Sequence, residues 1–162
     1  MSAARKILII GGIALALVGM LYGLYYALFA EHQALDAMGG SLANGFASAA
    51  TGDLAEANTA INDFGATKYD YVRQVDVHSH WIGLAVLMIV LGVVFDGASL
   101  GDRAGITVAL AFLVGSMVFP LGVILQTVHH GSTFASALAI SGSALVSLAL
   151  AALALGFMRQ HA

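Results

Sequence analysis

Four long apolar stretches constrain this chain more than any other feature of its sequence. They cover approximately residues 7–30, 80–95, 106–128 and 134–158, and none of them contains an aspartate, glutamate, lysine or arginine. A membrane-spanning helix needs about 20 mainly apolar residues, so the second stretch requires the residues before it to complete a crossing. We therefore predict an all-α membrane protein, with four transmembrane helices in an up-down bundle that forms a single domain over residues 1–162.

The composition supports a membrane protein and excludes several kinds of site. Hydrophobic residues make up 60% of the chain and charged residues only 9%, whereas a soluble domain has about a quarter charged residues. The mean hydropathy is +0.92. The absence of cysteine excludes disulfides, iron–sulfur clusters and thiolate metal sites. No basic cluster is present, so we expect the lipid bilayer, and no nucleic acid, as a partner.

The positions of the basic residues predict how the chain is oriented. Arg5 and Lys6 precede the first apolar stretch, which is longer than the core of about 7–15 residues in a signal peptide, so we interpret it as a retained span. Arg103 and Arg159 fall on the same side of the predicted bundle. The positive-inside rule then places both termini in the cytoplasm. We expect a bacterial inner (cytoplasmic) membrane, with residues 31–77 outside it.

Residues 31–77 have the pattern of a helical hairpin between the first two spans. Thr51-Gly52-Asp53, with Glu56 shortly after, is typical of a helix break followed by a new N-cap. The first two spans are thus expected to extend outward and to turn near Gly52, with His32 opposite residues 74–78. His78 should face the first helix and His80 should point away from it. On both arms apolar residues recur every three or four positions: Leu35, Met38, Leu42, Phe46 and Ala49, then Leu54, Ala57, Ile61, Phe64, Tyr71 and Val75.

Five of the six histidines are expected at one level, at the outer ends of the first three spans. Neutral imidazole is the commonest metal ligand, and carboxylates often orient its second ring nitrogen. This pattern predicts a metal or haem site, with His78 and His129 as the foremost ligands. The alternative is that these are ordinary residues of the membrane–water interface, like Trp81 beside them. The candidate ligands are His32, His78, His80, His129 and His130, with Glu31 and Asp76 as supporting carboxylates; His161 is expected to be solvated.

Haem b is the first choice among the possible cofactors, because facing histidines in a helix bundle can hold the iron from both sides. Copper is an alternative, since His78 and His80 form a His-x-His pair. Zinc is another, with a histidine plus Glu31 or Asp76 as ligands. No catalytic triad, phosphate loop or paired acid–base set is evident in the sequence, so we do not expect the isolated chain to be an enzyme.

Three short motifs carry a resemblance to a known group of proteins. They are Val77-His78-Ser79-His80-Trp81-Ile82-Gly83-Leu84, Pro120-Leu121-Gly122 and Ile140-Ser141-Gly142. Together they resemble small four-helix bacterial membrane proteins that have a His-x-His at the start of a span and are distantly similar to part of the haem–copper oxidase core. The resemblance covers the last three spans and implies a haem-binding protein. That pattern includes a histidine in the fourth span, which this chain lacks, so His129 or His130 would have to replace it.

Two functional hypotheses follow. The first is an inner-membrane protein that binds haem b, or copper, through histidines near the outer face and serves in electron transfer or as an accessory to a redox complex. Its outer hairpin would dock a membrane or periplasmic protein. The second is a cofactor-free structural or accessory subunit of a larger membrane complex. A sensor is a third class, although the short cytoplasmic tails offer no obvious output.

Overall fold

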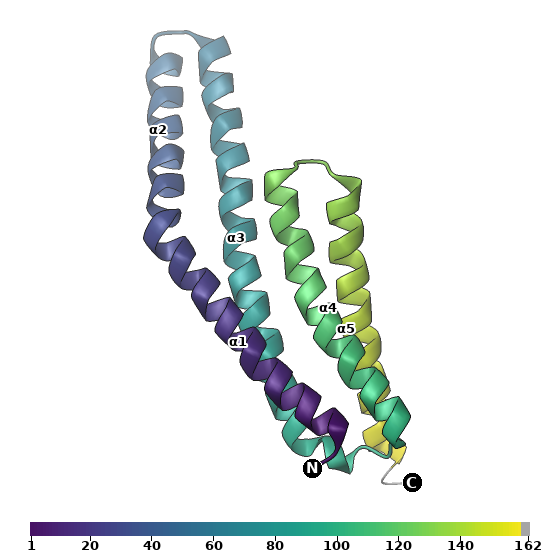
Figure 1. Ribbon diagram of the computed structural model, residues 1–162. Helices are drawn as coiled ribbons and strands as arrows, with labels where there is room; N and C mark the ends of the chain where they lie inside the picture. Colours follow the sequence, from purple (N-terminus) through teal and green to yellow (C-terminus); the bar gives the residue numbers. More distant parts are fainter. Residues whose placement is uncertain (160–162) are drawn as a thin grey trace.

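The computed structural model describes residues 1–159, and five long helices make up most of it (Figure 1). Four of them are long and apolar enough to cross a membrane, and they coincide with the four apolar stretches of the sequence. The fifth, α2, belongs to the hairpin. The helices are α1 (Ala3–Phe29), α2 (Glu31–Ala50), α3 (Leu54–Val94), α4 (Asp102–Val128) and α5 (Thr133–Arg159), with a short 3-10 helix, η1 (Phe95–Gly97), after α3.

The two arms of the hairpin join their spans in different ways. α3 runs without interruption from the hairpin turn to the far end of the bundle, as expected for the second span. The first span does not continue in this way, because Ala30 leaves the helical conformation, with φ −126° and ψ −35°. Figure 1 shows the consequence: α1 crosses α3 obliquely, and after the bend α2 runs alongside α3. The break therefore lets one connected segment pack against α3 in two directions.

The hairpin turns where the sequence predicts it. Gly52 has a φ of +83°, a left-handed conformation that glycine adopts without the steric cost of a Cβ atom. Asp53 then begins α3 as its N-cap, and its Oδ1 accepts a hydrogen bond of 3.0 Å from the backbone N–H of Glu56. The predicted turn and its cap are both confirmed.

Small residues, rather than the large apolar ones, hold the two arms together. Gly45 of α2 and Ala57 and Ala60 of α3 are buried, and a Cβ atom added at Gly45 would lie 3.6 Å from the Cβ atom of Ala60. Leu42 and Phe46 are exposed instead. The sequence pattern had suggested that the large apolar residues form the contact face. The helix backbones approach so closely that only small side chains fit between them.

The pair α4 and α5 also packs through glycines. A Cβ atom at Gly122 would overlap the backbone of Ala139, and one at Gly142 would overlap the backbone of Phe119. Such small residues allow helices in a membrane to pack closely enough for van der Waals contact along their backbones. The centre of the bundle is filled by large side chains that are fully buried, among them Leu8, Met88, Phe112 and Leu153.

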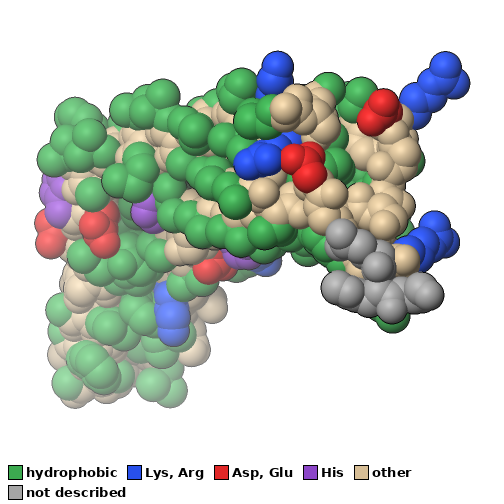
Figure 2. Space-filling model, turned by 90° about the horizontal axis from the view of Figure 1, so that it is seen from below, with side chains coloured by type: hydrophobic (Ala, Val, Ile, Leu, Met, Phe, Trp, Pro, Cys, Tyr) green, Lys and Arg blue, Asp and Glu red, His purple; other side chains and the backbone are tan. Residues whose placement is uncertain are grey.

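Both ends of the described chain lie at the end of the bundle opposite the hairpin (Figure 1). Figure 2 is viewed from this end and shows basic side chains gathered over the helix ends, with hydrophobic side chains covering much of the rest. The basic residues of this end are Arg5, Lys6, Arg103 and Arg159. The arrangement brings together the charges on which the predicted orientation depends.

Candidate functional site

The contacts between α3 and α4 give the level of each histidine in the bundle. At the end of α4 nearer the hairpin, Nε2 of His130 lies 2.8 Å from Oδ1 of Asp70. Deeper in the bundle, the rings of His80 and Phe119 are 4.8 Å apart. Helices rise about 1.5 Å per residue, so the ten residues from Asp70 to His80 correspond to about 15 Å along α3. The histidines therefore occupy two levels.

The contacts with α1 and α2 give the same register. The hydroxyl of Tyr71 donates to Oε1 of Glu31 at 3.3 Å, which places His32 near the level of residues 70–71. The ring of His78 reaches Gly19, ten residues before the end of α1. The expectation of one common histidine level is thus wrong. Before the apolar run 80–95 begins, α3 already packs against its neighbours: Gln74 donates to the hydroxyl oxygen of Thr127 on α4 at 2.7 Å, and Val77 is fully buried.

His78 fits against two glycines of α1, as its predicted direction requires. Its Nδ1 lies 2.9 Å from the backbone carbonyl oxygen of Gly19, and a Cβ atom at Gly23 would overlap the imidazole ring. A carbonyl oxygen only accepts hydrogen bonds, so Nδ1 of His78 carries the proton. The neutral ring then has its lone pair on Nε2.

His80 faces away from α1, also as predicted. Its Nδ1 lies 2.6 Å from the backbone carbonyl oxygen of Asp76, and by the same reasoning the free lone pair is on Nε2. The ring meets that of Phe119 edge to face. His80 is exposed and lines a groove of about 270 Å³ with Ser79, Gly83, Leu84 and Leu87. A Cβ atom at Gly83 would meet nothing within 4 Å, so this side of α3 is open.

The other three candidate ligands lie toward the hairpin side of the bundle, where α2 begins and α4 ends. His130 pairs with Asp70, and its ring lies 5.9 Å from that of Tyr69 in a tilted arrangement. His32 is exposed on α2, and His129 is exposed where α4 ends. His161 lies outside the described residues. The structure thus brings His130 to a carboxylate but does not bring the two foremost candidates, His78 and His129, to the same level.

The supporting carboxylates differ from the predicted pair. Glu31 accepts a hydrogen bond from Tyr71, and Asp76 contacts His80 through its backbone carbonyl rather than its side chain. The acid beside a histidine is Asp70, which the sequence reasoning missed because the height of the α4–α5 turn could not be read from the sequence. Within residues 1–159, no group of three or more histidines and acids is placed to hold a metal ion.

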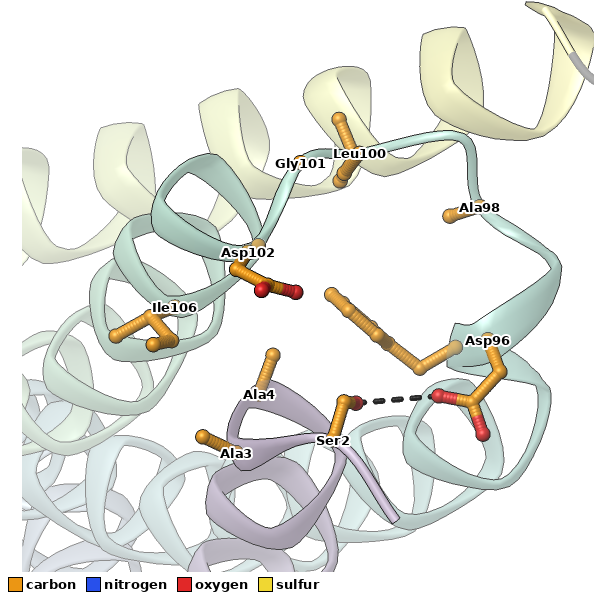
Figure 3. Close-up of a pocket in the computed structure, with 11 residues that line it drawn as sticks. Ser2, Ala3, Ala4, Asp96, Ala98, Leu100, Gly101, Asp102 and Ile106 are labelled. Carbon is orange, nitrogen blue, oxygen red and sulfur yellow. Dashed lines mark hydrogen bonds between the residues drawn. The ribbon is translucent and has the colours of Figure 1, made fainter.

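A separate cavity of about 440 Å³ lies at the end of the bundle that holds the termini (Figure 3). Asp102 points its carboxylate into this space, and Ser2 donates to Asp96 at its edge. Arg5 also donates to Asp96, at 2.8 Å. Arg5 and Asp96 are partly exposed, and their pairing ties the start of α1 to η1, which follows α3. We assign this cluster a structural role.

Gln126 lies in the last turn of α4. Its Nε2 donates to the hydroxyl oxygen of Ser136 on α5 at 3.3 Å. The side chain therefore bonds one helix to the next.

No family model, curated protein or solved structure matches this chain. The functional proposal below therefore depends on the geometry of its own residues.

Proposed function

We propose that the chain binds haem b through a histidine of α3 and takes part in electron transfer within a membrane. The observation that supports this most is that the Nδ1 atoms of His78 and His80 are each engaged by a backbone carbonyl. Ligating histidines commonly donate their second ring nitrogen in this way, which fixes the ring and leaves Nε2 for the metal. Along the bundle axis, both rings lie well away from the ends of α1 and α4. Ionisable side chains at such a depth in a membrane protein usually serve a function.

The ligand set suits haem better than a bare metal ion. A zinc site typically needs three or four protein ligands, and residues 1–159 provide no such group. The haem ring itself supplies four nitrogen ligands, so one or two imidazoles are sufficient to hold the iron. Copper and zinc stay alternatives in which further ligands come from another chain.

Of the two histidines, His80 has more room beside it. The ring of His78 is packed against Gly23, whereas His80 borders an open groove whose apolar wall includes Leu84 and Leu87. His80 would therefore hold the iron, while the carbonyl of Asp76 and the edge of Phe119 fix the direction of its ring. Haem, when bound, supplies reversible one-electron chemistry. A second axial imidazole would come from outside this chain, because the other histidine at this depth points toward α1.

A visible spectrum of the full-length protein, purified in detergent from haem-supplemented cells, tests this proposal. We expect a Soret band in the wild type and in His130→Ala, and its loss in His80→Ala. His130→Ala is the matched control because it removes an imidazole from the outer level only. A wild-type protein without a Soret band or stoichiometric iron would contradict haem binding, and stoichiometric copper or zinc in its place would favour those ions.

A second candidate function is a cofactor-free accessory subunit that docks a partner through the hairpin. Leu42 and Phe46 of α2 each follow, by one position, a residue that packs toward α3, and Ile61 of α3 follows the buried Ala60 in the same way. One position is a rotation of about 100°. Because the two arms are antiparallel, this rotation carries both sets to the same side of the hairpin. That side therefore presents exposed large apolar residues: Leu35, Leu42, Phe46, Leu54 and Ile61.

The charges of the hairpin lie mostly on its other sides. Measured from the residues of α3 that face α2, the side chains of Glu56, Asp63 and Asp70 are each rotated by about 60–100° about the helix axis, in the sense opposite to Ile61. On this side Asp70 meets the α4–α5 turn. The apolar side thus faces away from α4 and α5. Exposed Val72 and Val75 continue it along α3 toward the membrane. These features suit an integral membrane partner with an apolar helical surface outside the bilayer.

Site-specific photo-crosslinking in native membranes tests the docking proposal. A photoreactive phenylalanine analogue replaces Phe46 on the apolar side or, as the matched control, Thr59 on the opposite side of the hairpin. We expect a discrete adduct with a different membrane protein from position 46 only. Adducts of equal yield from both positions would contradict a specific docking side, and an adduct of twice the chain's own mass would identify a second copy instead.

We also propose that the end with both termini lies in the cytoplasm of a bacterial cell and that the hairpin lies outside the inner membrane. The clustered basic residues support this orientation. The chain has no cysteine, so single cysteines can report it directly. A membrane-impermeant maleimide should label Asn44→Cys in spheroplasts but Gly101→Cys only after lysis, and the reverse pattern would overturn the orientation.

A further inference from the structure

A second open groove, of about 510 Å³, lies on α3 between the hairpin turn and the histidines of that helix. Its floor is a stripe of residues that recur every three or four positions, namely Gly65, Tyr69, Val72 and Asp76. Lys68 and Arg73 flank this stripe, one on each side. Gly65 leaves one end of the groove wide, because nothing lies within 4 Å of its added Cβ atom. The groove is therefore an accessible recess with a cation on either side.

The two cations lie over aromatic rings. The guanidinium carbon of Arg73 is 5.1 Å from the centroid of the Tyr69 ring, and Nζ of Lys68 is 5.8 Å from that of the Phe64 ring. Both distances are within the range of a cation–π contact, about 6 Å. Among residues 1–159, neither cation pairs with a carboxylate, although most acidic residues of the chain lie between positions 31 and 76. Their N–H groups therefore stay available to an anion from outside the chain.

The groove lies at the level where two of the apolar spans end. Gln74 of α3 donates to the hydroxyl oxygen of Thr127, the last residue but one of α4. Asp70 meets His130 in the turn before α5. The spans α4 and α5 thus stop beside residues 70–74 of α3, and the groove extends to both sides of this level. Lipid headgroups begin where apolar spans end, so lipid phosphates are the anions present at this height.

We propose that the groove binds the phosphate of an anionic phospholipid, with Arg73 and Lys68 as the donors. The planar fork of an arginine donates two parallel hydrogen bonds to a phosphate, and the ammonium group of a lysine adds a point charge. The five residues from Lys68 to Arg73 correspond to about 7.5 Å along the helix, a separation that two long side chains can close around one phosphate. Basic pockets beside membrane spans recognise anionic headgroups in this way. The site does not depend on the proposed haem.

Asp76 determines where in the groove the phosphate lies. This residue is nearly one turn beyond Arg73, on the membrane side, and its carboxylate repels a phosphate that approaches from there. The phosphate therefore lies on the other side of Arg73, toward Lys68. Two cations and one carboxylate leave the groove positive, which favours a headgroup of net negative charge over a zwitterionic one.

A fluorescent reporter beside the groove tests the proposal, because the chain has no cysteine of its own. Ile61→Cys, labelled with monobromobimane, places the dye at an exposed position one turn from Gly65. The labelled full-length protein in dodecylmaltoside is titrated with dioleoylphosphatidylglycerol, with dioleoylphosphatidylcholine or with glycerophosphoglycerol, which is the anionic headgroup without acyl chains. We expect a saturable change with phosphatidylglycerol, binding of phosphatidylcholine weaker by about fivefold or more, and no response to glycerophosphoglycerol.

Two results would overturn the proposal. Equal affinity for phosphatidylcholine would contradict selection of an anionic lipid. Saturation by glycerophosphoglycerol over the same range of concentration would assign the groove to a soluble phosphate ester instead of a lipid.

Variants of the labelled protein locate the binding. Arg73→Gln and Lys68→Gln should each weaken the binding of phosphatidylglycerol about fivefold, the effect of one basic residue at an anionic lipid surface. Arg103→Gln is the matched control, since it removes one cation where α4 begins, at the opposite end of the bundle, and should leave the titration unchanged. Equal weakening by Arg73→Gln and Arg103→Gln would show general attraction between charges and overturn the site.

A last variant should strengthen binding, which a misfolded protein would not do. Asp76→Asn removes the carboxylate that repels the phosphate, so the affinity for phosphatidylglycerol should rise severalfold. Unchanged or weaker binding in Asp76→Asn would contradict the position of the phosphate between Arg73 and Lys68.

Discussion

Nδ1 of His78 lies 2.9 Å from the backbone carbonyl oxygen of Gly19, so a polar side chain of α3 bonds directly to the backbone of α1 inside the bundle. The contact is possible because Gly19 and Gly23 leave the surface of α1 bare at this level. The hydrogen bond satisfies one ring nitrogen and fixes the tautomer. It also joins the two helices that extend into the hairpin at a point well below it.

Replacing Gly23 with alanine should destabilise the protein by about 1–3 kcal/mol, the usual cost of forcing extra volume into a packed site. The added methyl group would overlap the His78 ring. Unfolding in detergent by denaturant titration measures this. Gly83→Ala is the control because nothing lies within 4 Å of its added Cβ atom. If His78→Ala does not relieve the cost of Gly23→Ala in a double mutant, the steric explanation is wrong.

Replacing Gly122 with alanine should separate α4 from α5, because the new methyl group would overlap the backbone of Ala139, which cannot rotate away. We expect a loss of about 1–3 kcal/mol in the free energy of unfolding. Gly39 offers a matched control in an open helical position of α2, where alanine should stabilise by about 0.5–1 kcal/mol. Equal effects at the two positions would contradict the close packing of α4 on α5.

The hairpin turn should depend on Gly52. Its φ of +83° suits glycine, and an L-residue there costs about 1–2 kcal/mol. Gly52→Ala is thus expected to loosen the turn and speed limited proteolysis between α2 and α3. Gly65→Ala, in the helical part of α3, should not do so. The rate of proteolysis of Gly52→Asn should lie between the rates of Gly52→Ala and Gly65→Ala, because asparagine tolerates the left-handed region better than alanine. A Gly52→Ala variant as resistant to the protease as the wild type would argue against this turn geometry.

The pair of His130 and Asp70 should contribute little to stability despite its short distance of 2.8 Å. The two side chains are 56% and 36% exposed, and exposed ion pairs contribute about 0–1 kcal/mol. Asp70→Asn should therefore change the free energy of unfolding by less than about 1 kcal/mol, as measured by denaturant titration. A larger loss would mean that this contact holds the α4–α5 turn against α3 more strongly than its exposure suggests.

Much of the fold follows from local patterns that need no knowledge of neighbouring helices. The four spans are determined by uncharged apolar runs, and the hairpin turn by Gly52 and Asp53. The opposite directions of His78 and His80 follow from the 100° step of a helix. Each of these features depends on residues that are close together in the sequence, so it can be predicted from the sequence alone.

The candidate site was less predictable, because it depends on the register between neighbouring helices, that is, on which residues of one helix lie level with which residues of the other. The start of the apolar run at His80 suggested a water boundary, but α1 and α4 extend past it and contact His78 and Gln74 of α3. The pairing of His130 with Asp70, and the burial of Trp81, depend on the same register.

The sequence alone determined that this chain forms apolar helices, where the hairpin turns and which way each histidine of α3 points. Tertiary structure alone decided the depth of the histidines, the break at Ala30 and the choice of small residues at the helix contacts. The reason is physical: hydrophobicity and turn propensity are properties of short segments, whereas the register between helices is set by which side chains can interdigitate when two backbones approach.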